Sequence, residues 1–291
     1  MDRLLAVAVL TVLIHLINTL IYSVRVSGVR TARLATAISL FNVIFLLSST
    51  ANMIQGPLLA TIVEGAIKKG GLAGVTDSME RQMQFPSQYM DQIGALAGDI
   101  RLVILAATVG TVLGWLLIPL FVELFVRAIM VFEKVGSVPG MIYMAIFSPR
   151  RMAGYAAGRC LAARPARNGS GMPAFRGLPW LFLAMNVLVT GIFTTGVLSA
   201  LYAGALYPGY RASATMLASI VNGVAQVLFA TVVDPTAARI TDQALQGSRA
   251  ESDVRRMAHY LAGTRLAGTL LAQAIFIPAA HLIRWAAVSL T

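Results

Sequence analysis

Long uninterrupted runs of apolar residues alternate along the chain with short polar and basic stretches. Several of these runs exceed the roughly 20 residues that a helix needs to cross about 30 Å of hydrocarbon. The sequence lacks the period-two alternation that is typical of an outer-membrane β-barrel. The pattern therefore predicts an all-α integral membrane protein, a bundle of six transmembrane helices near residues 4–24, 34–54, 102–124, 179–206, 212–233 and 260–287.

Composition supports this fold class. Apolar residues make up 57% of the chain and charged residues 12%, with a mean hydropathy of +0.75. Soluble domains carry roughly 25% charged residues. The first run begins with Asp-Arg, contains His15 and Asn18, and lacks a small-residue cleavage site before Arg25, so we interpret it as the first span and not as a signal peptide.

Basic residues concentrate in three of the connections between predicted spans. Arg25, Arg30 and Arg33 surround the first connection, and further arginines fill the third and fifth. The positive-inside rule places these connections in the cytoplasm, and alternation then places both termini outside. The net charge of +11 is thereby explained by topology and by contact with anionic lipids, without nucleic acid as a partner.

The second apolar run is unusually polar for a helix that faces lipid. It contains Asn42, Asn52 and Gln55 among several hydroxyl residues, and Gly56-Pro57 follows directly. Amides and hydroxyls at this depth indicate a helix that faces protein or a polar cavity. Proline lacks an amide donor and clashes with the preceding turn, so we expect the helix to end at Pro57.

The chain also contains two similar segments. When Pro57 is aligned with Pro235, Asn42 falls near Asn222, and Glu64 meets Asp242. Three spans in each copy would insert the second copy upside down, giving inverted repeats at 1–132 and 178–291 joined by a basic cytoplasmic segment at 133–177. Such repeats are typical of alternating-access transporters, with interrupted helices around the substrate. Alternatively, each proline simply begins an amphipathic helix at the membrane surface.

Carboxylates are few and scattered. Glu123 and Arg127 lie four residues apart, a spacing that favours their pairing on one helix face. Coupling to a proton or Na⁺ is a hypothesis for four acidic residues, each of which also suits the membrane interface: Glu64, Glu123, Asp234 and Asp242.

Signatures of catalysis or metal binding are missing from the sequence. A phosphate-binding P-loop, a His-Glu-x-x-His metalloprotease motif and a Gly-x-Ser-x-Gly elbow are all absent. Three dispersed histidines and the single Cys160 have no metal-ligand spacing. We therefore expect a transporter that is not an enzyme and needs neither a cofactor nor a metal.

Three motifs carry a family resemblance: Ser-Val-Arg-x-x-Gly-Val-Arg-Thr at 23–31, Ser-Leu-Phe-Asn at 39–42 and Asn-Met-Ile-Gln-x-Pro at 52–57. In these motifs the chain resembles the Amj family of alternate lipid II flippases. The resemblance implies a multi-pass protein of the bacterial plasma membrane that moves undecaprenyl-pyrophosphate-linked disaccharide-pentapeptide to the outer leaflet for peptidoglycan synthesis.

The resemblance and the residue pattern together suggest a substrate path. We expect Arg25, Arg30 and Arg33 to capture the pyrophosphate at the cytoplasmic face, because arginine binds phosphate oxygens with a planar fork of donors. The amides expected to line the path are Asn42, Asn52, Gln55, Asn222 and Gln226. A homodimer would provide the space that a six-helix bundle lacks. The alternatives are a transporter of another polyprenyl phosphate or polar solute, and a scaffold for cell-wall enzymes.

Overall fold

The structure is a computed structural model that describes residues 2–71, 85–148, 150 and 178–290. The backbone of these residues is almost entirely helical, as lipid requires of a chain that must satisfy its own hydrogen bonds. The helices are α1 (Asp2–Thr31), α2 (Leu34–Lys69), α4 (Ser87–Val135), α5 (Val138–Phe147), α7 (Trp180–Leu206), α8 (Arg211–Leu228), α9 (Asp234–Leu245) and α10 (Glu251–Ser289). A 3₁₀ turn, η2 (Pro208–Tyr210), precedes α8, and a π-helical segment, η3 (Phe229–Val233), joins α8 to α9.

Six helices in the described part of the chain are long and apolar enough to cross a membrane. They are α1, α2, α4, α7, the continuous run Pro208–Leu245 and α10. The predicted six-helix bundle is therefore confirmed. The helices extend well past the predicted spans, since α4 alone has 49 residues.

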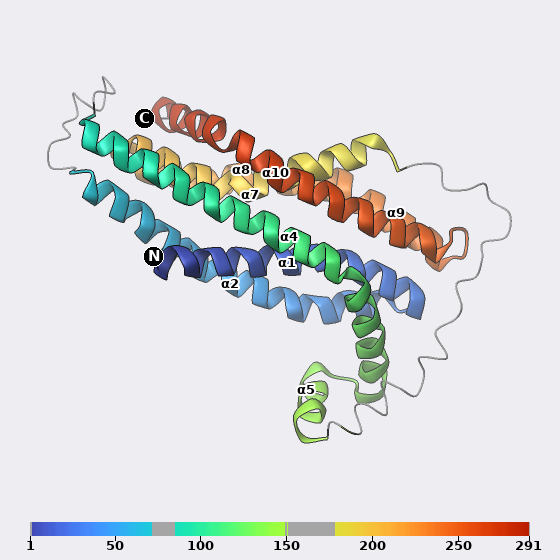
Figure 1. Cartoon of the computed structure of the whole chain (residues 1–291). Helices are drawn as coiled ribbons and strands as arrows, with labels where there is room; N and C mark the ends of the chain where they lie inside the picture. Colours follow the sequence, from blue (N-terminus) through green and yellow to red (C-terminus); the bar gives the residue numbers. More distant parts are fainter. Residues whose placement is uncertain (1, 72–84, 149, 151–177, 291) are drawn as a thin grey trace.

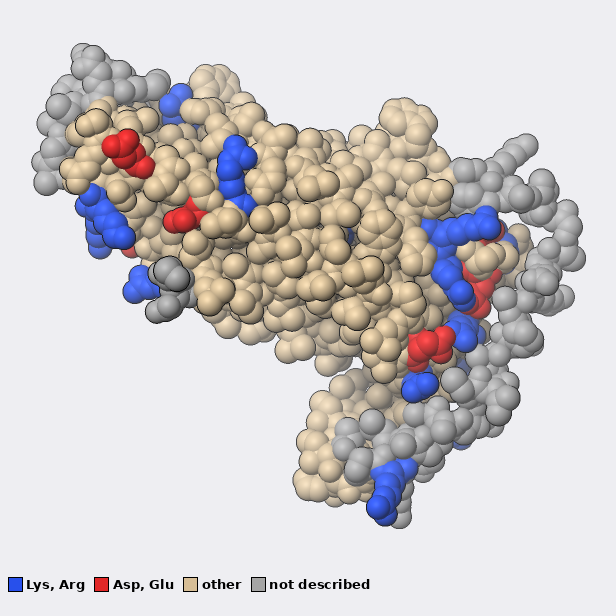
Figure 2. All heavy atoms as spheres, viewed as in Figure 1, with Lys and Arg blue, Asp and Glu red and all other residues tan. Residues whose placement is uncertain are grey.

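The six long helices lie along a common axis, and both chain ends lie at the same end of the bundle (Figure 1). We call this the terminal end. The opposite, loop end holds the α1–α2 turn and the α9–α10 turn, together with the C-terminal part of α4 and the start of α7. Figure 2 shows charged side chains gathered toward the two ends, with a largely uncharged belt between them. The described residues that flank the three connections predicted to be cytoplasmic thus share one end. Their side of the membrane stays a prediction.

Close helix contacts depend on glycine. Added side chains at Gly114 of α4 and Gly268 of α10 would lie 2.8 Å and 2.7 Å from the backbone oxygens of Leu16 and Val187. Small residues let the backbones of membrane helices approach this closely. Such close packing holds the helices together, because hydrophobic attraction between helices is weak in lipid. In this way α4 packs along α1, and α10 packs along α7.

Apolar clusters fill the bundle toward both ends. The terminal-end cluster joins α2, α4, α7 and α10 around Tyr89 and Phe276. Two clusters near the loop end surround Ile118 and Met257 in one case, and Leu20 and Phe125 in the other. The middle of the bundle, between these clusters, contains the polar side chains described below.

The predicted helix end at Pro57 is wrong. Pro57 lies inside α2, which continues to Lys69. Proline in a membrane helix is tolerated where neighbouring groups accommodate the freed backbone carbonyl. At Pro235 the chain does change conformation, because the π-helical turn of η3 comes just before α9. The two prolines therefore have different local structures.

The loop end also carries a side arm. Its first part is the C-terminal portion of α4, which turns away from the bundle, and its second part is the short α5 (Figure 1). Pro119 lies within α4 and is a usual cause of such bends. Helix α5 was not predicted and falls inside the expected connecting segment 133–177, of which residues 149 and 151–177 lie outside the described residues.

Candidate functional site

A cavity of about 600 Å³ occupies the middle of the bundle. Helices α1 and α2 form one wall, α7 and α8 the other, and α4 and α10 also contribute. Its polar lining consists of Thr11, His15, Asn18, Tyr22, Ser48, Ser49, Asn52, Gln55, Asn186, Thr190, Thr194, Asn222, Gln226 and Arg265. The cavity is therefore rich in amides and hydroxyls at a depth where lipid would favour apolar residues.

The polar face of α2 is held against α1 by side-chain hydrogen bonds. The amide of Gln55 donates to Thr11 Oγ1 at 2.5 Å, and the hydroxyl of Ser48 donates to Asn18 Oδ1 at 3.2 Å. Gln55 and Ser48 are buried. The prediction that this helix faces protein or a polar cavity is confirmed, since Gln55 and Ser48 contact α1 and line the cavity.

Arg265 of α10 is the one charged residue on the described cavity wall. Nearby, the amide of Asn186 donates to the Leu261 carbonyl at 3.0 Å and to Thr264 Oγ1 at 2.8 Å. These bonds fix the turn of α10 that precedes Arg265 against α7. The backbone at Arg265 is thereby held in position beside α7.

Several polar atoms around the cavity lack partners. Among the described residues, Arg265 Nε, His15 Nδ1 and Asn222 Oδ1 are buried without a hydrogen bond. Buried polar atoms are normally hydrogen-bonded, so three unpaired atoms in one region are unusual. They belong to side chains that line the cavity.

The cavity is open at the side of the bundle between α2 and α8. Both helices line it, and within the described chain they are not among the helix pairs that pack closely together. Asn52 on α2 and Gln226 on α8 belong to the cavity wall and are exposed. Apolar clusters lie beyond the cavity toward both bundle ends. The available path from the cavity therefore leads sideways, toward lipid.

Four of the five amides expected on the substrate path line this cavity: Asn52, Gln55, Asn222 and Gln226. Asn42 is exposed on α2 and does not line the cavity. The alignment of Asn42 with Asn222 therefore joins residues in different surroundings. Asn222 in turn fits beside Gly196 of α7, where an added side chain would collide with its amide.

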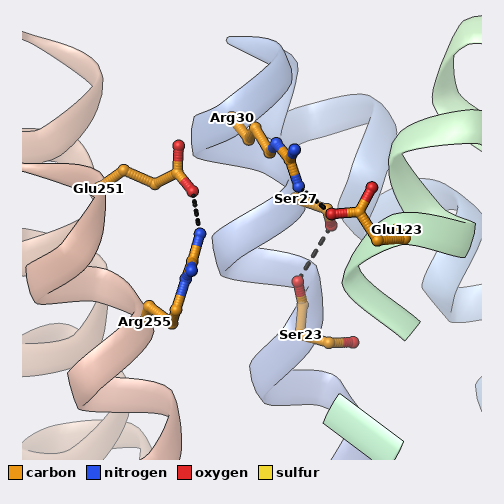
Figure 3. A network of polar contacts seen from close by, with 6 residues as sticks. All are labelled: Ser23, Ser27, Arg30, Glu123, Glu251 and Arg255. Carbon is orange, nitrogen blue, oxygen red and sulfur yellow. Dashed lines mark hydrogen bonds and ion pairs between the residues drawn. The ribbon is translucent and has the colours of Figure 1, made fainter. Parts of the chain in front are cut away.

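The three arginines expected to capture pyrophosphate lie near the loop end, outside the cavity wall. Each is bonded to a carboxylate from another helix. The pairs are Arg25 with Asp234 at 2.5 Å, Arg33 with Glu133 at 2.6 Å, and Arg30 with Glu123. Figure 3 shows Arg30 pointing from α1 toward Glu123 on α4, and the separate pair of Arg255 with Glu251 on α10. The pairs of Arg25 and Arg30 fasten α1 to α9 and α4, and the pair of Arg33 fastens the α1–α2 turn to α4.

The acidic residues considered for ion coupling also lie away from the cavity wall. Glu123 binds Arg30, so the expected pairing with Arg127 is wrong. Glu64 on α2 faces Arg211 on α8 at 3.6 Å, and Asp242 is exposed. Within the described residues no group of three or more His, Cys, Asp or Glu side chains could hold a metal ion.

Sequence reasoning did not single out Arg265, which lies five residues after the predicted start of the last span at residue 260. The structure begins α10 at Glu251, so Arg265 lies fourteen residues inside the helix, about 21 Å along its axis. The available signal was an isolated arginine within an apolar run, between the small residues Gly263 and Gly268.

Comparisons with known proteins agree with this architecture. The family described as "Amj: Alternate to MurJ" matches residues 10–287. The lipid II flippase Amj of Bacillus subtilis (strain 168) is 34% identical over 273 residues, which cover 94% of this chain and 92% of that protein. No solved structure matches the chain. Because the match extends across nearly all of both sequences, the chain belongs to the Amj family.

Proposed function

We propose that this protein is a lipid II flippase of the bacterial plasma membrane, a transporter and not an enzyme. The Bacillus subtilis relative is named for that activity and aligns over almost the whole chain. The observation that carries the proposal is the polar cavity in the middle of the bundle, open at the side between α2 and α8.

A cavity of this kind suits a substrate with a polar head and a lipid tail. The head group carries a pyrophosphate, and even a single charge in hydrocarbon costs several kcal/mol. Amides and hydroxyls on the cavity wall would replace lost hydration. The polyprenyl tail would remain in the bilayer, because the side opening lets the two parts of one molecule occupy different surroundings.

The cavity volume limits how much of the substrate fits at once. About 600 Å³ is the size of pockets for drug-sized ligands, whereas a disaccharide-pentapeptide is larger. We propose that the pyrophosphate and adjoining sugar occupy the cavity while the rest of the head group extends through the opening. A homodimer with additional space stays a prediction.

The apolar clusters at the two bundle ends separate the cavity from the two sides of the membrane. For the substrate to enter from one side and leave to the other, first one cluster and then the other must open. At the loop end, Arg25, Arg30 and Arg33 fasten the helices through their carboxylates. We propose that the pyrophosphate of an arriving substrate replaces these carboxylates as the partner of the arginines. Capture of the substrate would then also release the helices and open the loop end. Ion coupling through Glu64, Glu123, Asp234 or Asp242 stays a prediction.

We also propose that the two halves, 1–132 and 178–291, arose by duplication. In support, Gly114 against Leu16 and Thr19 resembles Gly268 against Val187 and Thr190. The first helix of each half packs against the other two helices of that half. Helices α1 and α7 run in opposite directions along the bundle, as inverted halves would (Figure 1).

The proposal is tested by reconstitution of the purified protein in liposomes that contain lipid II in both leaflets. A membrane-impermeant reagent then measures the fraction of lipid II that reaches the outer leaflet. We expect full accessibility with the protein and roughly half without it. A matched assay with undecaprenyl phosphate separates substrates, since transport of that lipid but not of lipid II would contradict the proposal.

A cellular experiment distinguishes transport from a scaffolding role. Depletion of the resident lipid II flippase stops cell-wall synthesis, and we expect expression of this protein to restore growth. Normal insertion without rescue, together with no exchange in liposomes, would favour a scaffold.

A further inference from the structure

The charge of Arg265 has no matching countercharge on the described cavity wall. Every other lining residue is apolar or neutral and polar, or is a histidine. An unpaired charge away from water is costly, and buried charges in proteins are normally paired. A cavity that retains such a charge is suited to an anion that arrives and leaves.

The position of Arg265 fits a ligand in the middle of the bundle. The residue lies about 21 Å along α10 from Glu251 by helical rise, and it lines the central cavity. Polar side chains of α1 and α8 line the same space, among them His15 and Asn222. Asn186 holds the adjacent turn of α10 against α7, which keeps the Arg265 backbone at this level of the bundle.

Three side chains that line the cavity supply the right chemistry for phosphate oxygens. The guanidinium of Arg265 carries only N–H donors, and a neutral His15 imidazole donates from one of its two ring nitrogens. The amide oxygen of Asn222 lies toward Gly196 of α7. The side chain also lines the cavity, where its NH₂ group can donate to a phosphate oxygen. Arginine with two neutral donors is a common arrangement around a phosphate.

We propose that Arg265, His15 and Asn222 form an anion site that holds the phosphate groups of the lipid-linked substrate inside the cavity. This inference rests on the proposed function, and it assigns the pyrophosphate to residues other than the arginines at the loop end. Arg25, Arg30 and Arg33 would act before the substrate reaches the cavity, and Arg265 would act while the substrate crosses.

Binding measured on the full chain in lipid nanodiscs tests the site without reference to transport. The probes are undecaprenyl pyrophosphate and undecaprenol, which share a tail and differ in the phosphates. We expect wild-type protein to prefer the pyrophosphate, and Arg265→Gln to weaken that binding by about tenfold to a hundredfold, the value of a charge-assisted hydrogen bond. Arg265→Lys should fall between them, because lysine is a point charge without the planar fork.

Arg255→Gln is the matched control. Arg255 lies on the same helix, is exposed, and pairs with Glu251 at 2.8 Å. We expect this variant to bind like the wild type. Equal affinity of Arg265→Gln and Arg255→Gln for undecaprenyl pyrophosphate would overturn the proposal. Helical content and elution as a single species confirm that each variant is folded.

The source of the phosphate is settled by competition with inorganic pyrophosphate. Weak competition supports a lipid-linked ligand, whereas tight binding of inorganic pyrophosphate without binding of the lipid would overturn that assignment. The liposome assay separates this site from the proposed function. Lipid II exchange that persists in Arg265→Gln would refute the site alone, and absent exchange by a wild-type protein that binds the pyrophosphate lipid through Arg265 would refute the function alone.

Discussion

The arginines at the loop end and the arginine in the cavity have opposite surroundings. Arg25, Arg30 and Arg33 each contact a carboxylate on another helix. Arg265 has no carboxylate beside it on the described cavity wall, and its Nε lacks a hydrogen bond. The difference teaches that a basic residue in a membrane protein can connect helices through a resident countercharge, or can await a countercharge on the substrate.

Charge reversal at Arg265 should have the largest effect. A carboxylate in the cavity would repel pyrophosphate at low dielectric, so we expect Arg265→Glu to lower lipid II exchange by more than a hundredfold. Exchange in proteoliposomes measures the effect. Arg255→Glu on the same helix is the control, and comparable loss in both variants would show that the helix is sensitive to any charge reversal.

Filling the cavity should have the next largest effect. An added Cβ at Gly56 meets no atom within 4 Å, and this glycine lines the cavity. Because the first added atom has space, we expect Gly56→Leu to reduce exchange about tenfold by occupying substrate space. The matched control is Gly65→Leu, on the same helix and also facing open space but not on the cavity wall. Full exchange by Gly56→Leu would exclude the cavity as the path.

Displacement of Asn222 should have a moderate effect. An added methyl group at Gly196 would collide with the Asn222 amide, so we expect Gly196→Ala to reduce undecaprenyl-pyrophosphate affinity severalfold. Gly223→Ala is the control, because its methyl group would enter open space on the same helix as Asn222. An unchanged affinity in Gly196→Ala would remove Asn222 from the anion site.

Breaking the ion pair between Arg30 and Glu123 should have a smaller effect, on thermal stability. Swapping the two residues should restore that stability. Partly exposed ion pairs contribute up to about 1 kcal/mol, so Glu123→Gln should lower thermal stability slightly. The double variant Arg30→Glu with Glu123→Arg should recover that stability. Recovery of exchange as well would assign Arg30 to helix fastening, whereas recovered stability without exchange would support capture of pyrophosphate.

Asn42→Ala should have the smallest effect. Asn42 is exposed and lies outside the cavity wall, so exchange should match that of the wild type. Asn52→Ala, ten residues later on the same helix, should reduce exchange because Asn52 lines the cavity. Equal losses in both variants would contradict the assigned path.

The six spans could be predicted because apolar runs of sufficient length allow only helices in lipid. Most cavity amides could also be found, since an amide within such a run needs a polar environment. The helical period explains why Asn42 lies outside the cavity wall. Ser48, Asn52 and Gln55 lie on one face of α2 and line the cavity, whereas Asn42 is rotated about 120° from Ser48 at 3.6 residues per turn.

Other features depend on tertiary structure. A predicted start near residue 260 placed Arg265 close to a membrane surface, where snorkelling explains an arginine. The earlier start of α10 at Glu251 moves it deep into the bundle. The ion-pair partners of Arg25, Arg30 and Arg33 come from helices α4 and α9, and local sequence carries no signal for such distant pairing.

Photo-crosslinking tests most directly whether the head group of lipid II passes through the cavity. A photoreactive side chain is placed at position 52 on the cavity wall or at position 42 outside it, both exposed positions of α2. Lipid II labelled on its sugar is then irradiated with each protein in proteoliposomes. The cavity path predicts strong labelling at position 52 and little at position 42, with labelling at 52 weakened by Arg265→Gln. Equal labelling at both positions, or labelling at 42 alone, would contradict it.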